Sequence, residues 1–133
     1  MLGLAIAIAS NAHIGQIDKS GKAYILHPLA VMNKVGDQDE KIVAVLHDVV
    51  EDTTLGLNFL SSMFSPRIIE ALDAISQRKN ELYFDYIKRV KENELATIVK
   101  IEDLRHNSSP ERAFEGSKGL EKRYYKALTR LTT

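Results

Sequence analysis

The chain is 133 residues long, which is enough for one hydrophobic core but not for a second sizeable one. Its 44% hydrophobic and 27% charged residues are typical of a globular protein, and 18 Lys and Arg balance 18 Asp and Glu. This balance excludes a general attraction to nucleic acid or to an anionic membrane, and the lack of cysteine excludes disulfides and thiolate metal sites. We therefore expect one cytoplasmic domain over residues 1–133, without a nucleic-acid or membrane partner.

The first predicted helix covers residues 2–13, where small and apolar residues recur at helical spacing. Its apolar stretch, 2–9, is too short to span a bilayer, and no basic residue precedes it as in a signal peptide. A polar loop over 15–22 follows. Pro28 suits the first turn of a second helix, and Gly36 is a natural residue just past its end.

Capping residues predict the helices that follow. Asp37 with Glu40 three residues later forms a capping pair for a third helix. Ser65, followed directly by proline, marks another helix start, and Asn93 caps one more. A last helix is expected over 118–131. Because strand alternation is hard to find and only three prolines interrupt the chain, we predict an all-α, single-domain fold.

The segment 42–52 carries the residues with the most chemistry. It is interpreted as one helix, apolar almost all round, that ends in His47-Asp48 and Glu51-Asp52. On one helix, His47 lies one turn from Glu51, and Asp48 one turn from Asp52. Three carboxylates and an imidazole within six residues repel one another unless a cation is present, and a metal ion is the simplest compensation. The simpler alternative is a hydrogen-bonded His-Asp pair followed by a solvated helix end.

Two distant segments favour the metal. His27 stands at the start of the second helix, and Asp103 lies on the helix that Asn93 caps, one turn before Asn107. Two nitrogen and two carboxylate ligands suit a five- or six-coordinate divalent ion with positions left open for water. The candidate ligand set is therefore His27, His47, Asp48 and Asp103.

The pattern of two His, an Asp that follows the second His, and a later Asp resembles the HD superfamily of metal-dependent phosphohydrolases. More closely, the chain resembles the guanosine tetraphosphate hydrolase domain of the Rel/Spo proteins and their small stand-alone relatives, over residues 12–107. The resemblance implies an all-helical HD-domain fold with one Mn²⁺ ion. It rests on five segments in the right order: 15–16, 19–21, 24–31, 47–53 and 100–107.

The resemblance also implies an activity, the hydrolysis of the 3′-pyrophosphate of guanosine tetra- or pentaphosphate to GDP or GTP and pyrophosphate. By similarity, Mn²⁺ is held by the four candidate ligands, and Glu51 and Asp52 lie outside its coordination sphere. Their place in the family is to orient the attacking water and accept its proton, with Glu51 the first choice as base.

Substrate contacts are carried over in the same way. Lys19 and Ser20 match nucleotide-contacting positions of the family, and Asn107 matches a residue near the ribose and phosphate. Lys100 has no firm counterpart, and a plain salt bridge is at least as good an interpretation. For both Tyr124 and Tyr125 core packing is favoured over base stacking. His13 and His106, which match no ligand position, are expected to have supporting roles.

One position departs from the family pattern. Asp18 stands where these hydrolases commonly have arginine, and an anion beside a polyphosphate is expected to weaken binding or to redirect substrate preference. Lys22 is a candidate to offset that charge in part. Two alternatives stay open: another phosphorylated nucleotide such as NADPH as the substrate, or a catalytically silent nucleotide-sensing domain. The intact ligand set and Glu-Asp pair argue against the sensor.

Overall fold

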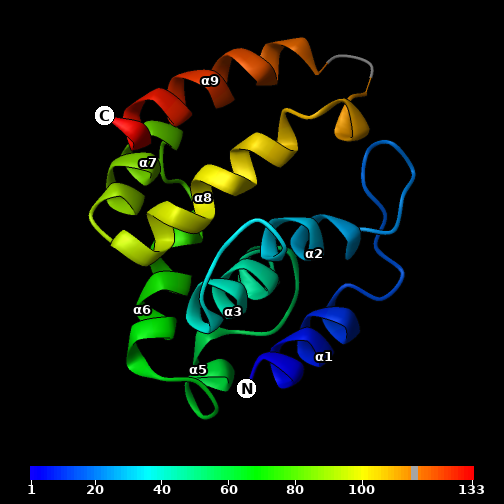
Figure 1. Cartoon of the computed structure of the whole chain (residues 1–133), viewed down its shortest axis with the longest axis vertical. Coiled ribbons are helices and arrows are strands. Elements are labelled where there is room, and N and C mark those ends of the chain that lie inside the picture. Colours follow the sequence, from blue (N-terminus) through cyan, green and yellow to red (C-terminus); the bar gives the residue numbers. More distant parts are fainter. Residues whose placement is uncertain (115–116) are drawn as a thin grey trace.

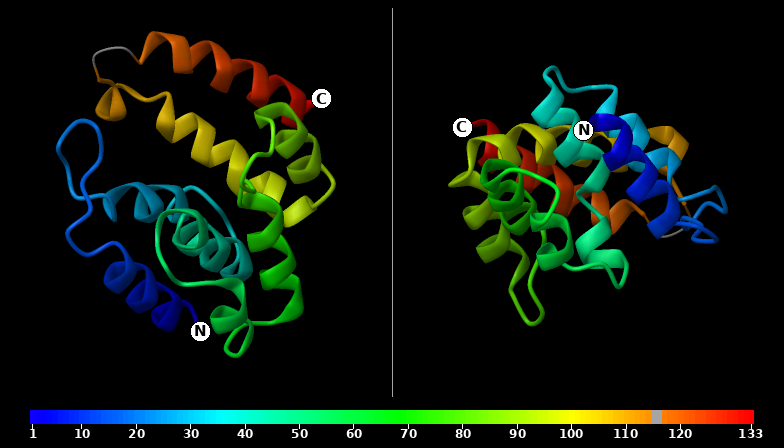
Figure 2. Two further views of the ribbon diagram at one scale, coloured as in Figure 1. Left: turned by 180° about the vertical axis from the view of Figure 1, so that it is seen from behind. Right: turned by 90° about the horizontal axis from the view of Figure 1, so that it is seen from below.

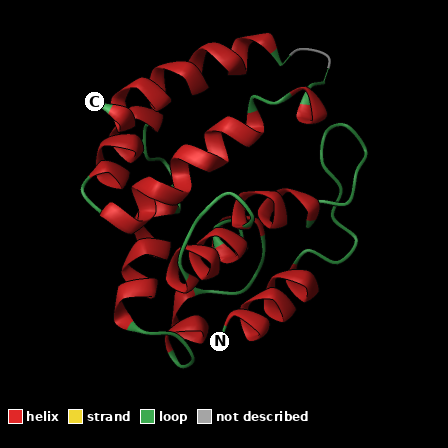
Figure 3. Cartoon of the chain, in the orientation of Figure 1, coloured by secondary structure: helices red, strands yellow, loops and turns green. Residues whose placement is uncertain are grey.

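The computed structural model of the chain describes residues 1–114 and 117–133 (Figure 1). Within these residues the regular structure is helical, apart from one isolated β-bridge between Ile17 and Ala23 (Figure 3). The prediction of an all-α, single-domain fold is confirmed. None of the helices in the described part of the chain is both long and apolar enough to cross a membrane.

The helices form a bundle around α3, which packs against α1, α2, α6 and α8, while α9 runs along α8 and also contacts α7 (Figures 1 and 2). The two chain ends lie far apart, at opposite sides of the bundle. The elements are α1 (Leu2–Ala12), α2 (Leu26–Met32), α3 (Gln38–Leu46), α4 (Val49–Asp52), α5 (Leu57–Ser61), α6 (Pro66–Ile75), α7 (Tyr83–Lys91), α8 (Glu94–Asn107), the 3₁₀ turn η1 (Pro110–Arg112) and α9 (Lys118–Thr132).

The central position of α3 follows from its composition. Five successive apolar residues, 42–46, are all buried, so the helix has no solvent-facing side in its second half. Helices on several sides are needed to cover it, and α1, α2, α6 and α8 do so. The residues that follow α3 are thereby carried into the interior of the bundle.

The three capping predictions are confirmed. The carboxylate of Asp37 accepts a hydrogen bond from the Glu40 amide at 2.8 Å, and the side chain of Asn93 accepts one from Ala96 at 2.9 Å. Ser65 caps α6 in the same way, with proline in the first helical turn. These bonds satisfy amides that a helix start leaves without an intrahelical partner.

The interpretation of 42–52 as one helix is wrong. The helical hydrogen-bond pattern is interrupted at His47 and Asp48, between α3 and α4, although both residues keep αR backbone angles. The His47 ring bonds through Nδ1 to the carbonyl oxygen of Ala44, which in an uninterrupted helix would accept the amide of Asp48. The side chain thus competes for the backbone acceptor, and the break lets neighbouring side chains point to a common place.

Other boundaries differ less. The second helix begins at Leu26, ahead of Pro28, and ends at Met32. Two helices, α5 and α7, were not predicted from the sequence. For α7 a signal exists, because Tyr83, Tyr86, Ile87 and Val90 follow helical spacing and all four side chains are buried or half-buried. Its start carries no capping side chain, since Leu82 occupies the cap position.

Replacing Asn93 with alanine removes the side-chain cap of α8 and should lower the free energy of unfolding by about 1 kcal/mol. The matched control is Ser117→Ala, because Ser117 occupies the cap position of α9 without a side-chain cap bond. Urea denaturation of both variants measures the difference. Equal losses in the two variants would contradict a stabilising role for the Asn93 cap.

Candidate metal centre

Three parts of the fold bring the four candidate ligands together. His27 comes from α2, His47 and Asp48 from the break between α3 and α4, and Asp103 from α8. One ligand atom of each residue lies within 4.8 Å of the others. Both imidazoles and Asp103 are buried, and the Asp48 side chain is 13% exposed.

The distances within the cluster converge on one point. His27 Nε2 lies 2.8 Å and His47 Nε2 lies 3.1 Å from the same oxygen, Asp103 Oδ1. Asp48 Oδ2 lies 3.0 Å from His47 Nε2 and 3.6 Å from His27 Nε2. Two imidazole nitrogens and two carboxylate oxygens therefore surround a shared centre.

The hydrogen bond of His47 determines what the cluster can hold. Because Nδ1–H donates to the Ala44 carbonyl, Nε2 is the atom left to face the carboxylates of Asp48 and Asp103. Without a metal these carboxylates hold the pKa of His47 above its ordinary value, although burial of the ring lowers it. A proton on Nε2 then compensates the two negative charges, and a divalent cation can take its place. The cluster fits a divalent metal ion.

Both carboxylates of the cluster have further partners. The Tyr24 hydroxyl donates to Asp48 Oδ2 at 2.7 Å. Lys100 Nζ donates to Asp103 Oδ2 at 2.8 Å, which confirms the salt-bridge interpretation of this lysine, and Asn107 Nδ2 donates to Asp103 Oδ1 at 3.3 Å. These contacts fix the orientation of the two carboxylates before any metal binds.

A second chain of contacts runs outward from His27. Its Nδ1 lies 2.7 Å from Nδ1 of His106, and the two rings are stacked. His106 Nε2 in turn lies 2.6 Å from the Glu111 carboxylate. The supporting role expected of His106 is therefore an orienting contact to His27. His13, also expected to support the site, lies outside this chain and bonds to Gln16 at 2.8 Å.

Glu51 and Asp52 lie beside the cluster but are not part of it. Both line a polar cavity of about 240 Å³ together with Asp48 and Asp103. Glu51 is an exposed residue, and partial removal of its carboxyl from water at the cavity wall raises its pKa to about 7. A hydrogen bond from the Gln77 amide opposes the shift, and the charge of Asp48 adds to it. Partial removal from water and the charge of Asp48 also raise the pKa of Asp52, which is likewise an exposed residue. Glu51 can thus exchange a proton near neutral pH.

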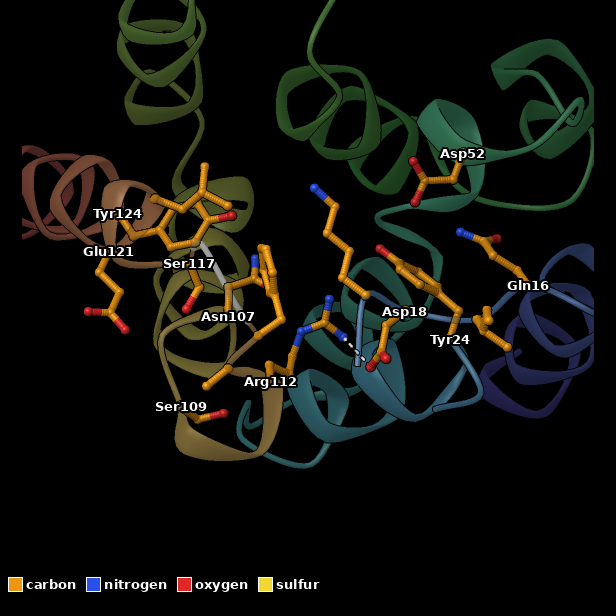
Figure 4. A pocket seen from close by; sticks show the side chains of 15 residues that line it. Gln16, Asp18, Tyr24, Asp52, Asn107, Ser109, Arg112, Ser117, Glu121 and Tyr124 are labelled. Atoms are coloured by element: carbon orange, nitrogen blue, oxygen red, sulfur yellow. Dashed lines mark ion pairs between the residues drawn. The ribbon is translucent and has the colours of Figure 1, made fainter. Parts of the chain in front are cut away.

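A larger cavity of about 330 Å³ adjoins the first and shares Asp52 and Asn107 with it (Figure 4). Lys19 lines this larger cavity, with Nζ 5.1 Å from the Phe114 ring. The structure thus brings two of the three predicted substrate contacts together. It does not bring the third, because Ser20 lies outside the lining and its hydroxyl donates to Asp18.

The structure separates the two tyrosines of the last helix. Tyr124 lines both cavities, and Figure 4 shows it across the larger cavity from Tyr24. Tyr125 is 74% exposed, so the prediction of core packing is wrong for this residue. The two side chains are adjacent in sequence and leave the helix about 100° apart, so only one of them can face the cavity.

Asp18 has a structural role that the sequence did not reveal. Its Oδ1 accepts hydrogen bonds from the amides of Ser20 and Lys22, each at 2.9 Å, and so holds the loop in shape. Its Oδ2 lies 3.7 Å from Arg112 Nη1. The Lys22 ammonium binds the Glu111 carbonyl at 3.0 Å, so Arg112 and not the Lys22 side chain is the ion-pair partner of Asp18.

Several residues of the cavity walls were missed by sequence reasoning. Tyr24 belongs to a recognised motif segment, but nothing in the sequence indicates that its hydroxyl reaches Asp48. Arg112 follows Asn107 in a stretch without family resemblance, and Arg123, whose guanidinium lies 4.2 Å from the Tyr83 ring, comes from α9. The position of Arg123 depends on how α9 packs along α8.

The curated relatives of the chain include GTP pyrophosphokinases and guanosine-3′,5′-bis(diphosphate) 3′-pyrophosphohydrolases. Over 106 residues the chain is 30% identical to a bifunctional (p)ppGpp synthase/hydrolase of Escherichia coli, a match that covers 76% of this chain and 15% of that protein. Over 74 residues it is 38% identical to a guanosine-3′,5′-bis(diphosphate) 3′-pyrophosphohydrolase of Haemophilus influenzae, covering 53% of this chain and 11% of that protein. The chain thus spans less than a fifth of the length of either relative. No protein-family model matches it.

A solved structure shares the fold. It belongs to a metazoan SpoT ortholog described as hydrolysing ppGpp, and it matches with a TM-score of 0.77 at 19% sequence identity. The match covers 98% of this chain and 84% of that one. Together with the curated relatives, this likeness confirms the resemblance to HD-type ppGpp hydrolase domains.

Binding of Mn²⁺ should stabilise the fold, because the cluster exists only in the folded chain. At an ion concentration about 100 times its Kd, the free energy of unfolding should rise by about 2.7 kcal/mol. Asp103→Asn should abolish that increase, whereas Asp73→Asn, which alters an exposed pair with Arg78, should retain it. Chemical denaturation with and without the ion measures both, and an undiminished increase in Asp103→Asn would contradict the cluster as the binding site.

Proposed function

From the similarity of this chain to HD-type ppGpp hydrolase domains, we propose that it hydrolyses the 3′-pyrophosphate of guanosine tetra- or pentaphosphate in a metal-dependent reaction. One observation carries the proposal: the buried cluster of two His and two Asp adjoins a polar cavity whose wall holds two further carboxylates. The hydrolase unit in this proposal is residues 1–133, with its motifs between 12 and 107.

We propose Mn²⁺ as the resident ion, held by His27, His47, Asp48 and Asp103. When bound, such an ion polarises a phosphoryl oxygen and lowers the pKa of a coordinated water. The chain's own contribution is to hold the four ligands in advance. Tyr24 and Lys100 fix the two carboxylates, while the Ala44 carbonyl and His106 fix the two imidazoles.

Glu51 is the proposed general base. Its carboxyl is held by the Gln77 amide at the cavity wall, and a pKa near 7 suits a group that must accept a proton at neutral pH. The water oxygen forms a bond to the phosphorus next to the ribose, and the bond from that phosphorus to the ribose 3′ oxygen breaks. Glu51 takes one proton from the attacking water and releases it to solvent, the ribose 3′ oxygen takes a proton from solvent, and pyrophosphate leaves. Asp52, between the two cavities, helps to orient the water.

The nucleoside occupies the larger cavity in this proposal. Asn107 lines both cavities and can reach the ribose or its phosphate, while Lys19 offers a cation at the outer wall. Ser20 acts through the loop, because its hydroxyl and amide are both bonded to Asp18. Tyr124 presents an aromatic ring to the cavity and is a better candidate for base contact than Tyr125.

Product analysis tests the proposal directly. Metal-stripped protein reconstituted with Mn²⁺ should convert guanosine tetraphosphate to GDP and pyrophosphate, and chelated protein should not. If a parallel incubation shows turnover of NADPH but not of guanosine tetraphosphate, the proposed substrate is wrong and the proposed hydrolytic site stands. An absence of turnover despite bound metal would leave the nucleotide-sensing domain as the function.

Glu51→Gln should lower kcat by about 10² to 10⁴, because the amide cannot accept the proton of water. Its content of Mn²⁺ should stay at the wild-type value, since Glu51 lies outside the four-residue cluster. Steady-state kinetics and metal analysis measure the two quantities. Glu70→Gln, which alters an exposed carboxylate on α6, is the control and should leave both unchanged. A near wild-type kcat in Glu51→Gln would exclude Glu51 as the base.

A further inference from the structure

We propose that Arg112 is a specificity-determining residue that binds the phosphate attached to the ribose 2′ or 3′ oxygen of the substrate, and that Asp18 positions its guanidinium. The inference rests on the proposed function, because it places a phosphorylated nucleotide across the two cavities. It adds the contact through which the site selects among nucleotides.

The position of Arg112 is the first observation. The 3₁₀ turn η1 carries it to the point where the two cavities meet, and it lines both of them. Among the residues that the structure describes, it is the one cation with that property. Figure 4 shows Arg112 beside Asp18, between Asn107 on one side and Tyr24 on the other. A nucleotide with its base in the larger cavity and its cleavable phosphates in the smaller one must pass this point.

The state of its guanidinium is the second observation. The Arg112 side chain is only 17% exposed, and it lies over the Tyr24 ring, with Cζ 5.7 Å from the centroid. Its contact with Asp18, at 3.7 Å, is ionic and longer than a hydrogen bond. Within the described ranges no hydrogen bond engages its side-chain donors. A half-buried arginine with unengaged donors is suited to bind a phosphate, which guanidinium recognises with paired hydrogen bonds.

The other cations near the cleavage site are less available. Lys100 already donates to Asp103 Oδ2, so its charge is neutralised within the cluster. Arg123 is an exposed residue whose guanidinium lies over the Tyr83 ring, and it lines the smaller cavity but not the larger one. Lys19 lines the larger cavity but not the smaller one. Asp18 stands where similar hydrolases commonly have arginine, and in this proposal Arg112 supplies the basic group that the loop lacks.

Two contacts fasten the loop to the turn that bears Arg112. Lys22 Nζ donates to the Glu111 carbonyl, and Asp18 Oδ2 faces Arg112 Nη1. Asp18 also organises its own loop through the amides of Ser20 and Lys22. Its carboxylate therefore attracts Arg112 from a fixed place. From the sequence, Asp18 is expected to be unfavourable beside a polyphosphate. In the fold, the same carboxylate holds Arg112 toward the proposed substrate.

Calorimetric titration with guanosine tetraphosphate in EDTA tests the contact without turnover. Arg112→Ala should weaken binding about 10- to 100-fold, and Arg112→Lys should restore part of the loss. The control, Arg105→Ala, removes an exposed arginine that pairs with Glu102 on α8 and should leave affinity unchanged. GDP lacks a phosphate on the 2′ or 3′ oxygen, so Arg112→Ala should weaken the binding of GDP less than about threefold. Equal losses for both nucleotides would overturn the assignment of Arg112 to that phosphate.

The positioning role of Asp18 is tested by Asp18→Asn, whose amide oxygen can still accept the loop hydrogen bonds. We expect about three- to tenfold weaker binding of guanosine tetraphosphate. The double variant Asp18→Asn/Arg112→Ala should bind no more weakly than Arg112→Ala alone, because Asp18 acts through Arg112. Additive losses would mean that Asp18 acts on the loop alone and would overturn its positioning role.

These titrations are independent of the proposed activity. If the wild-type protein hydrolyses no nucleotide, the proposed function fails, whereas Arg112-dependent binding of guanosine tetraphosphate still supports the inference. If hydrolysis occurs, Arg112→Ala should raise KM about 10- to 100-fold and should also lower kcat, because the phosphate that Arg112 binds in guanosine tetraphosphate is the one that water attacks. Equal affinity of the wild-type protein and Arg112→Ala, or no binding by the wild-type protein, would overturn the inference whatever the activity.

Discussion

The site depends on one hydrogen bond, from the His47 ring to the carbonyl oxygen of Ala44. At the end of α3 the ring takes the acceptor that the Asp48 amide would use in a continuous helix. The bond also leaves Nε2 as the nitrogen that faces Asp48 and Asp103. The same interaction therefore interrupts the helix, orients a ligand and defines the centre where a metal can bind.

The remaining helices supply what this break requires. The apolar residues 42–46 bury α3 on all sides, so the break lies inside the bundle and α2 and α8 can approach it. α2 brings the candidate ligand His27, and α8 brings the candidate ligand Asp103. Lys100 pairs with Asp103, and the Tyr24 hydroxyl donates to Asp48. Because both carboxylates have these partners, the cluster can keep its arrangement when a metal ion replaces the proton on His47.

How far the sequence predicts this protein depends on the range of the interactions. Asp37 and Asn93 were identified as caps because a cap bond joins residues three apart. The ligand set followed from residue types and family resemblance, and the structure brings its four members together. The break at His47 was missed because a side chain competes there with the backbone. Arg112 was missed because its contact with Asp18 spans most of the chain and has no local pattern.

The three-residue turn η1 faces two parts of the site at once. Its Glu111 side chain contacts His106, which contacts His27, while Arg112 lines both cavities. A substitution in this turn that shifts Glu111 as well as Arg112 will therefore change both the cavity walls and the contact that orients His27. The shape of the cavities and the support of the candidate metal centre are consequently linked, and a change to the backbone of η1 alters both together.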